Sequence, residues 1–415
     1  MIVFQATMCG ILLILQCKDC TCELGNLKEK LVGLLKNRGP DNQNSVQFTS
    51  ENGMKFYMHA SLLWLRGSEP KIQPIVKDEN FLLWNGDLFN IDLPEGLSDT
   101  EYISNRLSNA CEKKSIRQTF AELNGPGAYV YYNQNLETIW FGRDFFGRHS
   151  LLTSIKSCCV IISSIGFMNS ELVEVPALGV YELSIETFSL DLKPWANRKP
   201  NEIKLPFEAN LCFHKCLTPT VKSVRTDPTN SLEYANLDDY MNCQIAQTAI
   251  NDLRKTLLLS VKERVSAQPM FCKKCIGRRL SKHDPEFVKD CSNCKTAVLF
   301  SGGLDSTVLV YLAALSVRQG EQIDLINVAF QQADGSYAVP DRLTAFQAFE
   351  ELQELVCPLK VTLNLILVNV TKNELKEWRE AQIKDLLWPL DTVLDDRYIF
   401  LFELCVIVLR LFLKF

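Results

Sequence analysis

The hexapeptide Ser301–Ser306, Ser-Gly-Gly-Leu-Asp-Ser, has the residue types of a phosphate-binding loop. An apolar, β-prone run precedes it at residues 297–300, and an apolar, helix-like run follows at residues 307–315. Two adjacent glycines let backbone amides approach a ligand, and the start of the helix adds free N–H groups and a positive dipole end. Such a site suits phosphate or pyrophosphate, with Asp305 holding a bridging Mg²⁺ ion. A plain left-handed turn is the competing interpretation.

Cys9 lies between Met8 and Gly10 at the start of an expected strand. If processing or translation makes Cys9 the first residue, its own α-amino group, with a pKa of about 7.7–8.0, can act as general base for its thiol. An internal cysteine lacks that base. This use of Cys9 as a nucleophile therefore needs translation to start at Met8 or removal of the extension at residues 1–8. Without either, Cys9 is a buried strand cysteine.

Three further polar stretches have side chains that bind charged or polarised groups. Arg38 precedes a Gly-Pro turn, and its guanidinium can clamp a carboxylate through two parallel hydrogen bonds. Asn85 beside Gly86 offers an amide and a backbone N–H for an oxyanion hole, although Asn-Gly alone also favours a hairpin turn. Asp99 follows Ser98 at an expected helix start, where capping alone would explain it.

Two CxxC pairs are separated by 15 residues, Cys272 and Cys275 in the first and Cys291 and Cys294 in the second. This spacing predicts a tetrahedral structural zinc site with four thiolate ligands. Four free cysteines, or two disulfides in a surface insertion, are the alternatives.

The elements around these residues alternate between strands and helices near the C-terminal end. We expect strands at residues 323–330 and 361–368 and a helix at residues 343–355. This alternation predicts a doubly wound parallel sheet, whose ligands lie at the carboxyl ends of the strands. A polar, proline-broken segment at residues 191–236 precedes apolar residues that recur every four positions from Leu237 to Val261, which predicts one long amphipathic helix.

Composition restricts the partners and the compartment. The chain has 415 residues, 47% hydrophobic and 22% charged, with a net charge of −5, so we expect no nucleic-acid partner. The first 16 residues lack a basic segment and a cleavage site, and the 16 cysteines are mostly scattered singly, which predicts a reducing, cytoplasmic setting. The apolar run Tyr398–Phe415 contains Glu403 and Arg410 and is short for a membrane span, so we expect a divergent tail whose apolar surface promotes association.

The order of the polar motifs between residues 8 and about 184 resembles a class II glutamine amidotransferase domain with an N-terminal nucleophile. The motifs are Cys9, Arg38-Gly39-Pro40-Asp41, Gln73-Pro74, Asn85-Gly86-Asp87, Ser98-Asp99-Thr100-Glu101, Leu123-Asn124-Gly125 and Gly142-Arg143-Asp144. The resemblance implies an αββα sandwich over residues 9–190. It also implies that Cys9 takes the glutamyl group, that Arg38 and Asp99 bind the α-carboxylate and α-amino groups of glutamine, and that Asn85 and Gly86 form the oxyanion hole. Asp87 is a further glutamine-binding residue by this resemblance, and it stands where asparagine synthetases usually carry Glu.

The Ser301 loop resembles the PP-loop of the ATP pyrophosphatases, S-G-G-x-D-S. The resemblance implies Mg²⁺-ATP as a ligand, with its pyrophosphate end on the loop and its adenine between two strand residues. The implied ATP-binding residues are Leu299, Ser301, Gly302, Gly303, Asp305, Ser306 and Val328. Together the two domains resemble the glutamine-hydrolysing asparagine synthetases. Residues 295–397 match the first part of the synthetase domain, after a linker, helix and cysteine insertion at residues 191–294 and before the tail at residues 398–415.

The family resemblance implies glutamine hydrolysis at Cys9 and ATP-dependent amidation of aspartate at the PP-loop. Two alternatives stay open. The first is a catalytically weak or silent scaffold that binds nucleotide. The second is a tRNA-modifying PP-loop enzyme, a class in which some members carry CxxC metal sites.

Overall fold

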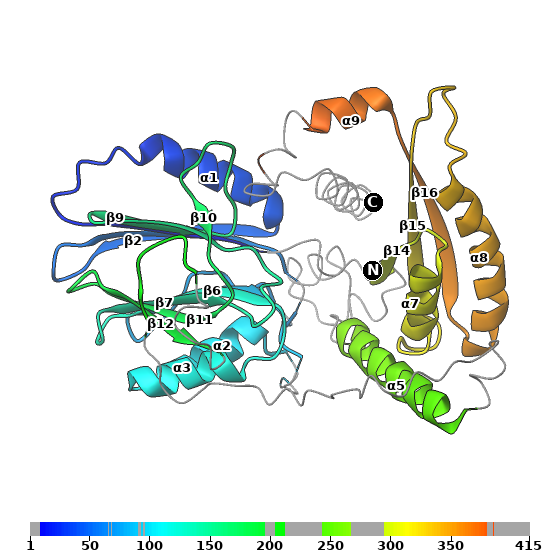
Figure 1. The fold of residues 1–415 in the computed structure, drawn as a ribbon, viewed down its shortest axis with the longest axis horizontal. Helices are drawn as coiled ribbons and strands as arrows, with labels where there is room; N and C mark the ends of the chain where they lie inside the picture. The colour runs from blue at the N-terminus through cyan, green and yellow to red at the C-terminus, as the bar shows by residue number, and fades with distance from the viewer. Residues whose placement is uncertain are drawn as a thin grey trace, which may run out of the picture. The chain divides into compact units, whose positions relative to one another are not determined.

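The structure, a computed structural model, describes residues 9–195 except 65, 68, 90–92 and 94–95, and also residues 204–211, 243–266, 294–379 and 385. The described residues fall into two compact units, shown in Figure 1. The first contains residues 9–211 together with 376–379 and 385, and the second contains residues 243–375. The expected extension at residues 1–8, most of the cysteine insertion and the apolar tail lie outside the described residues.

The first unit contains two β-sheets. One has six antiparallel strands in the order β10-β8-β9-β1-β3-β2. The other has seven strands in the order β13-β12-β11-β7-β6-β5-β4, antiparallel except for the β12–β13 pair. The strands are β1 (Gly10–Gln16), β2 (Asn42–Thr49), β3 (Lys55–Leu62), β4 (Ile75–Lys77), β5 (Asn80–Gly86), β6 (Gly127–Asn133), β7 (Thr138–Arg143), β8 (Leu152–Lys156), β9 (Cys159–Ser163), β10 (Val173–Glu174), β11 (Gly179–Ser184), β12 (Leu190–Pro194) and β13 (Asn210–Leu211).

A hydrophobic core fills the space between the two sheets. Strand β1 is almost wholly apolar and buried on both faces, because one face meets this core and the other meets a helix. Aromatic rings join the sheets across the core. Three neighbouring pairs have centroids 4.4–4.6 Å apart, two of them stacked and the third tilted. The rings belong to Phe48 on β2, Phe56 on β3, Phe81 on β5 and Tyr132 on β6.

Helices cover the outer face of each sheet (Figure 1). Helix α1 (Gly25–Arg38) packs through Leu31 and Leu35 on the six-stranded sheet. Helices α2 (Asp99–Ser108) and α3 (Lys113–Glu122) pack through residues such as Ile103 and Ile116 on the seven-stranded sheet. The unit therefore has the α-β-β-α order of layers that we expect from the sequence.

The second unit contains a parallel sheet of three strands in the order β14-β15-β16. Its strands are β14 (Thr296–Leu299), β15 (Gln322–Phe330) and β16 (Thr362–Val370), and its helices are α5 (Gln244–Ser266), α7 (Leu304–Ala314), α8 (Pro340–Val356), η3 (Cys357–Leu359) and α9 (Lys372–Trp378). Helices α5, α7 and α8 share one hydrophobic core with one face of the sheet. The strands and helices expected after residue 296 are confirmed, with ends shifted by at most three residues. The helix expected from Leu237 to Val261 is observed at Gln244–Ser266.

Only the C-terminal half of helix α5 packs against the core of the second unit. Val261 and Val265 are buried in the core, whereas Ile245 and Leu253 are 71% and 60% exposed. The four-residue apolar repeat thus predicts the helix but overstates the length of its buried face. Among the described helices, none is long and apolar enough to cross a membrane.

Candidate active sites

Cys9 lies immediately before β1, and its thiol is held by the residue that follows β3. The thiol donates to the carbonyl of Leu63 at 3.6 Å and accepts from the Leu63 N–H at 3.4 Å. Burial raises the pKa of the Cys9 thiol to about 12, and the carboxylates of Asp99, Asp87 and Asp41 raise it further against the opposing effect of the Leu63 hydrogen bond. The thiol is therefore protonated at neutral pH, and an attack by its sulfur requires a base.

Arg38 is the last residue of α1, and the turn that follows it packs closely against β3. A Cβ atom on Gly39 would lie 1.9 Å from the carbonyl oxygen of Ser61, so only glycine lets the turn approach β3 this closely. Nη1 of Arg38 donates to the carbonyl of Ser164 at 2.8 Å. Ser164 in turn accepts from the backbone N–H of Ile11, two residues beyond Cys9.

Asn85 lies at the end of β5, a strand that contacts β1. Its side chain is 1% exposed, and its Nδ2 finds no hydrogen-bond partner among the described residues. A buried amide without a partner carries a desolvation cost that an incoming acceptor would relieve. Gly86 follows it, and a Cβ there would lie 2.3 Å from the Pro126 carbonyl oxygen, so the strand end is closely packed. Asn-Gly here ends a strand and does not form a hairpin turn.

Asp99 is the first residue of α2 and is 6% exposed. Its carboxylate accepts from the Thr100 N–H at 2.8 Å and from the indole Nε1 of Trp84 at 3.4 Å. Burial and the nearby charge of Asp87 raise the pKa of Asp99 from 3.8 to about 6, while Arg66 opposes the shift. The carboxylate is ionised at pH 7, where it can pair with an ammonium group.

The loop after β7 packs beside Arg38. Asp144 accepts from the N–H groups of Gly127 and Arg148 and pairs with the Arg148 guanidinium at 2.9 Å. His149 is 3% exposed, and burial lowers its pKa to about 3, with Asp144 opposing and the charge of Arg38 adding to the shift. A neutral imidazole is thus held near the arginine.

In the second unit, Gly302 fixes the position of the Ser301 loop. Its φ is +78°, and a Cβ there would lie 2.4 Å from the backbone nitrogen of Ala345 on α8. Gly303 caps α7, and its N–H donates to Ser301 Oγ at 3.3 Å. Ser306 is buried and donates to the Gly303 carbonyl at 3.0 Å, whereas Asp305 is exposed in the first turn of α7. The strand, glycine turn and helix expected from the sequence are present.

Leu299 and Val328 lie on the same face of the parallel sheet. The register pairs Leu299 with Ile326, so Val328 lies one pleat further toward the carboxyl end of the neighbouring strand. Both side chains are partly exposed, and their face is the one opposite the core shared with α5, α7 and α8.

Of the CxxC cysteines, Cys294 is described, and the other three lie outside the described residues. Its thiol donates to the carbonyls of Thr296 and Gln322 at 3.0 and 3.1 Å. The predicted zinc site stays a prediction.

Comparisons with known proteins decide the family. No family model matches the chain. An asparagine synthetase domain-containing protein of Drosophila melanogaster is 32% identical over 400 residues, which cover 89% of this chain and 69% of the relative. The chain belongs to the asparagine synthetase domain-containing protein family. A family member from Mus musculus, asparagine synthetase domain-containing protein 1, is 30% identical over 451 residues and covers 89% of this chain and 70% of its own.

Among solved structures, glutamine phosphoribosylpyrophosphate amidotransferase from B. subtilis, complexed with ADP and GMP, covers 93% of this chain and 94% of its own. The identity is 11% and the TM-score is 0.38. This similarity is too low to assign the fold of this asparagine synthetase domain-containing chain. The fold is assigned from its own sheets and layers, described above.

The structure adds residues to the family site that sequence reasoning missed. Arg66 pairs with Asp87, with 3.6 Å between Nε and Oδ1, and donates to the carbonyl of Leu88. In the second unit, buried Arg342 donates to Asn327 Oδ1 and to the carbonyl of Val368, so it joins the carboxyl ends of β15 and β16. No motif marks these arginines, because their partners lie 15 or more residues away along the chain.

Proposed function

We propose that this chain is a glutamine-dependent amidotransferase of the asparagine synthetase type, with glutamine hydrolysis at Cys9 and ATP-dependent amidation of aspartate at the Ser301 loop. The observation that carries the proposal is the grouping around Cys9. A buried, protonated thiol lies within electrostatic reach of Asp99, Asp87 and Asp41. The same compact unit holds the Asn85 amide, whose Nδ2 has no hydrogen-bond partner among the described residues. Family membership supports a related function.

In the proposed first half-reaction, the α-amino group of an N-terminal Cys9 accepts the thiol proton. The sulfur attacks the side-chain carbonyl carbon of glutamine, and the proton passes to the departing nitrogen as ammonia leaves. Water then hydrolyses the thioester to glutamate. Asn85 Nδ2 and the Gly86 N–H would stabilise the oxyanion, while Arg38 would bind the α-carboxylate of glutamine and Asp99 its α-amino group.

Because the pKa of the Cys9 thiol is raised, the thiol cannot attack glutamine unless a base accepts its proton. While residue 8 is attached, the nitrogen of Cys9 is an amide and has no basicity. Glutaminase activity is thus proposed for the form that begins at Cys9.

In the proposed second half-reaction, the loop residues Ser301, Gly302, Gly303 and Ser306 bind the pyrophosphate end of ATP. Mg²⁺, when bound by Asp305 and the phosphates, would neutralise charge on the leaving pyrophosphate. The carboxylate of aspartate attacks the α-phosphate to give aspartyl-AMP, and ammonia then displaces AMP. The exposed carboxylate at the start of α7 and the closely packed glycine turn support this role.

The experiment begins with intact mass and N-terminal sequencing of protein from its own cells. Glutaminase activity would then be compared between a form that begins at Cys9 and a form that retains residues 1–8. Activity confined to the first form, and reduced about 10²–10³-fold by Asn85→Ala, is the expected result. Equal activity in both forms would contradict the mechanism. Cys111→Ser, which changes an exposed cysteine, is the control.

A silent nucleotide-binding scaffold is the second candidate, favoured by the eight residues that precede Cys9. Aspartate-dependent ATP–pyrophosphate exchange separates the two. Exchange supports the enzyme, whereas ATP binding without exchange supports the scaffold.

A further inference from the structure

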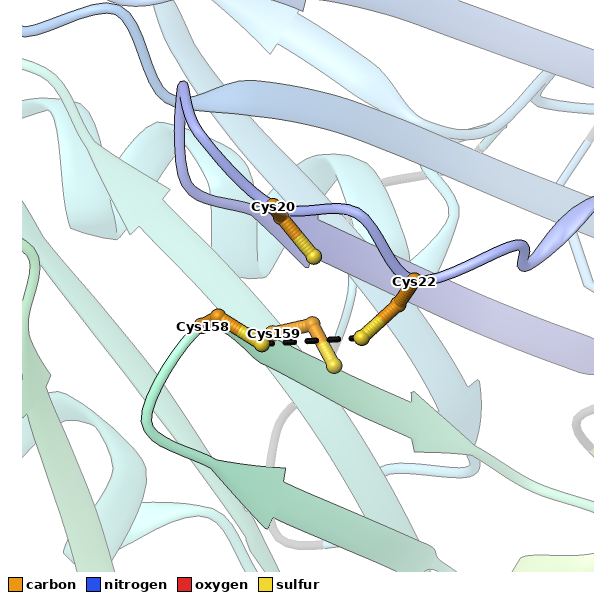
Figure 2. Close-up of side chains that lie close together, drawn as sticks. All are labelled: Cys20, Cys22, Cys158 and Cys159. Carbon is orange, nitrogen blue, oxygen red and sulfur yellow. Dashed lines mark hydrogen bonds between the residues drawn. The ribbon is translucent and has the colours of Figure 1, made fainter.

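Four cysteines from distant parts of the sequence meet at one end of the six-stranded sheet. Cys20 and Cys22 lie in the loop that follows β1, and Cys158 and Cys159 lie in the turn between β8 and β9 and at the start of β9. The antiparallel pairing of β1 with β9 brings these segments together, because Gln16 at the end of β1 is opposite Cys159. Figure 2 shows that the four side chains point toward one another.

The sulfur positions match those of a tetrahedral thiolate site. All four Sγ atoms lie within 4.8 Å of one another, and those of Cys22 and Cys158 are 3.5 Å apart. Four sulfurs about 2.3 Å from a zinc ion at the centre of a tetrahedron are about 3.8 Å apart. Small adjustments of the side chains would therefore admit the ion.

Local backbone structure explains how adjacent cysteines can share one site. Side chains of successive strand residues point to opposite faces. Cys158 lies in the hairpin turn, however, and only Cys159 belongs to β9, so the alternation does not apply to the pair. Cys17, in the same loop as Cys20 and Cys22, differs from them because its side chain packs on the core between the sheets.

We propose that Cys20, Cys22, Cys158 and Cys159 bind one structural Zn²⁺ ion as four thiolates. Binding releases the thiol protons to solvent and involves no oxidation. Thiolate sulfur selects soft or borderline metals, and a tetrahedral set of four sulfurs suits zinc. With four protein ligands, the ion has no open position for catalysis.

The surroundings supply partners for the charge of a zinc–thiolate centre. Gln16 Nε2 lies 3.9 Å from Cys20 Sγ in hydrogen-bonding geometry and also donates to the Cys22 carbonyl at 3.2 Å. Such N–H contacts to ligand sulfurs orient the ligands of metal sites. The Lys156 ammonium, whose first partner is Glu171, also interacts with the thiols of Cys159 and Cys22.

The proposed ion would tie the loop after β1 to the β8–β9 hairpin. Cys9 lies at the opposite end of β1, and seven strand residues span about 23 Å. The zinc would therefore stabilise the strand that carries the nucleophile without contacting glutamine. This site is distinct from the predicted CxxC quartet, with which it shares no residue.

Metal content of the full-length chain tests the proposal. A background chain with Cys272→Ser, Cys275→Ser and Cys291→Ser lacks three of the four ligands of the other predicted site. After refolding with zinc sulfate and dialysis, we expect this chain to retain one zinc per molecule by mass spectrometry of the metal. Adding Cys22→Ser and Cys158→Ser should remove that zinc, whereas Cys17→Ala or Cys111→Ser should leave it in place.

If the variant with Cys22→Ser and Cys158→Ser does not fold, spectroscopy of the background chain, in which all four cysteines are intact, still tests the proposal. X-ray absorption of the zinc-loaded background chain should show four sulfur ligands at about 2.3 Å, and cobalt substitution should give the visible bands of tetrahedral cobalt thiolate. A folded background chain without zinc, a shell with nitrogen or oxygen ligands, or a Cys22–Cys158 disulfide in the native chain would overturn the proposal.

Discussion

The guanidinium of Arg66 forms an ion pair with the carboxylate of Asp87, 3.6 Å away, in a site where both side chains are less than one-fifth exposed. Arg66 also lowers the pKa of Asp99, which burial and Asp87 raise. One arginine thus pairs with Asp87 and opposes the rise in the pKa of Asp99. Its residue type alone gave no sign of this role.

The first prediction concerns this arginine. Arg66→Gln should raise the pKa of Asp99 above 6, so glutamine binding near neutral pH should weaken. Each pH unit by which the titration moves reduces the ionised fraction about tenfold below the pKa. Calorimetry of glutamine binding from pH 5 to 8 measures the shift. Arg106→Gln, which breaks a surface ion pair with Glu122 on the outer helices, should leave the pH profile unchanged.

The second prediction is that Asp99→Asn stabilises the protein while it abolishes glutamine binding. A pKa raised from 3.8 to about 6 means that the folded state holds the proton more tightly than the unfolded chain. The contribution of Asp99 to stability is therefore greatest below about pH 4 and is lost as pH rises to 6, a change of about 3 kcal/mol. An asparagine at position 99 carries no charge, so the variant does not lose this stability as pH rises.

Urea denaturation at pH 4.5 and pH 7.5 measures this difference. The gain in the free energy of unfolding should be larger at pH 7.5. A gain that is independent of pH would show that charge on Asp99 is not its cause.

The third prediction concerns acid sensitivity at His149. Its pKa is about 3 in the folded state, mainly because of burial, against an ordinary value of 6.5. As pH falls below 6.5 the unfolded chain gains a proton that the folded chain does not, so stability declines. At pH 5 the loss is about 2 kcal/mol. His149→Gln should remove this loss relative to the parent at each pH.

Denaturation of parent and variant at pH 7.5 provides the reference, since the histidine is neutral in both states there. If the two proteins lose stability in parallel from pH 7.5 to 5, the burial of a neutral His149 is not responsible.

The fourth prediction concerns the loop before α7. Gly302→Ala places a Cβ 2.4 Å from the Ala345 backbone at a φ of +78°, so the loop must move away from α8. We expect a loss of about 1–3 kcal/mol in the stability of the second unit and weaker ATP binding. Gly303→Ala is the matched control for stability, because its φ is −68° and its Cβ meets only Ser301 Oγ at 3.4 Å. Equal destabilisation by both would contradict the steric argument.

Sequence reasoning reached the residues whose chemistry is encoded locally. The alternation of strands and helices after residue 296 was visible because each buried strand is a short apolar run between turns. Cys9, Arg38 and Asn85 were selected from their immediate neighbours and their order along the chain. The structure places Cys9 immediately before β1 and Asn85 on β5, and these two strands contact each other.

Features assembled by long-range pairing were not visible. Cys22 and Cys158 are 136 residues apart, and only the register of β1 with β9 makes them neighbours. The exposed first half of α5 has the same apolar period as its buried second half, so periodicity alone could not separate them. Arg66 lies in a loop, where its partners depend on tertiary packing.

The ring stack between the two sheets has a consequence for how activity fails on heating. Cys9, the proposed nucleophile, precedes a strand of one sheet and Asn85 lies in the other, so the proposed catalysis would depend on the alignment of two separately hydrogen-bonded layers. Phe48 and Phe81 belong to different sheets, and their ring centroids are 4.4 Å apart. Loosening of these rings would let the layers slide before either sheet melts. Thermal inactivation should then follow the near-ultraviolet circular dichroism of the aromatic core and precede the loss of backbone signal.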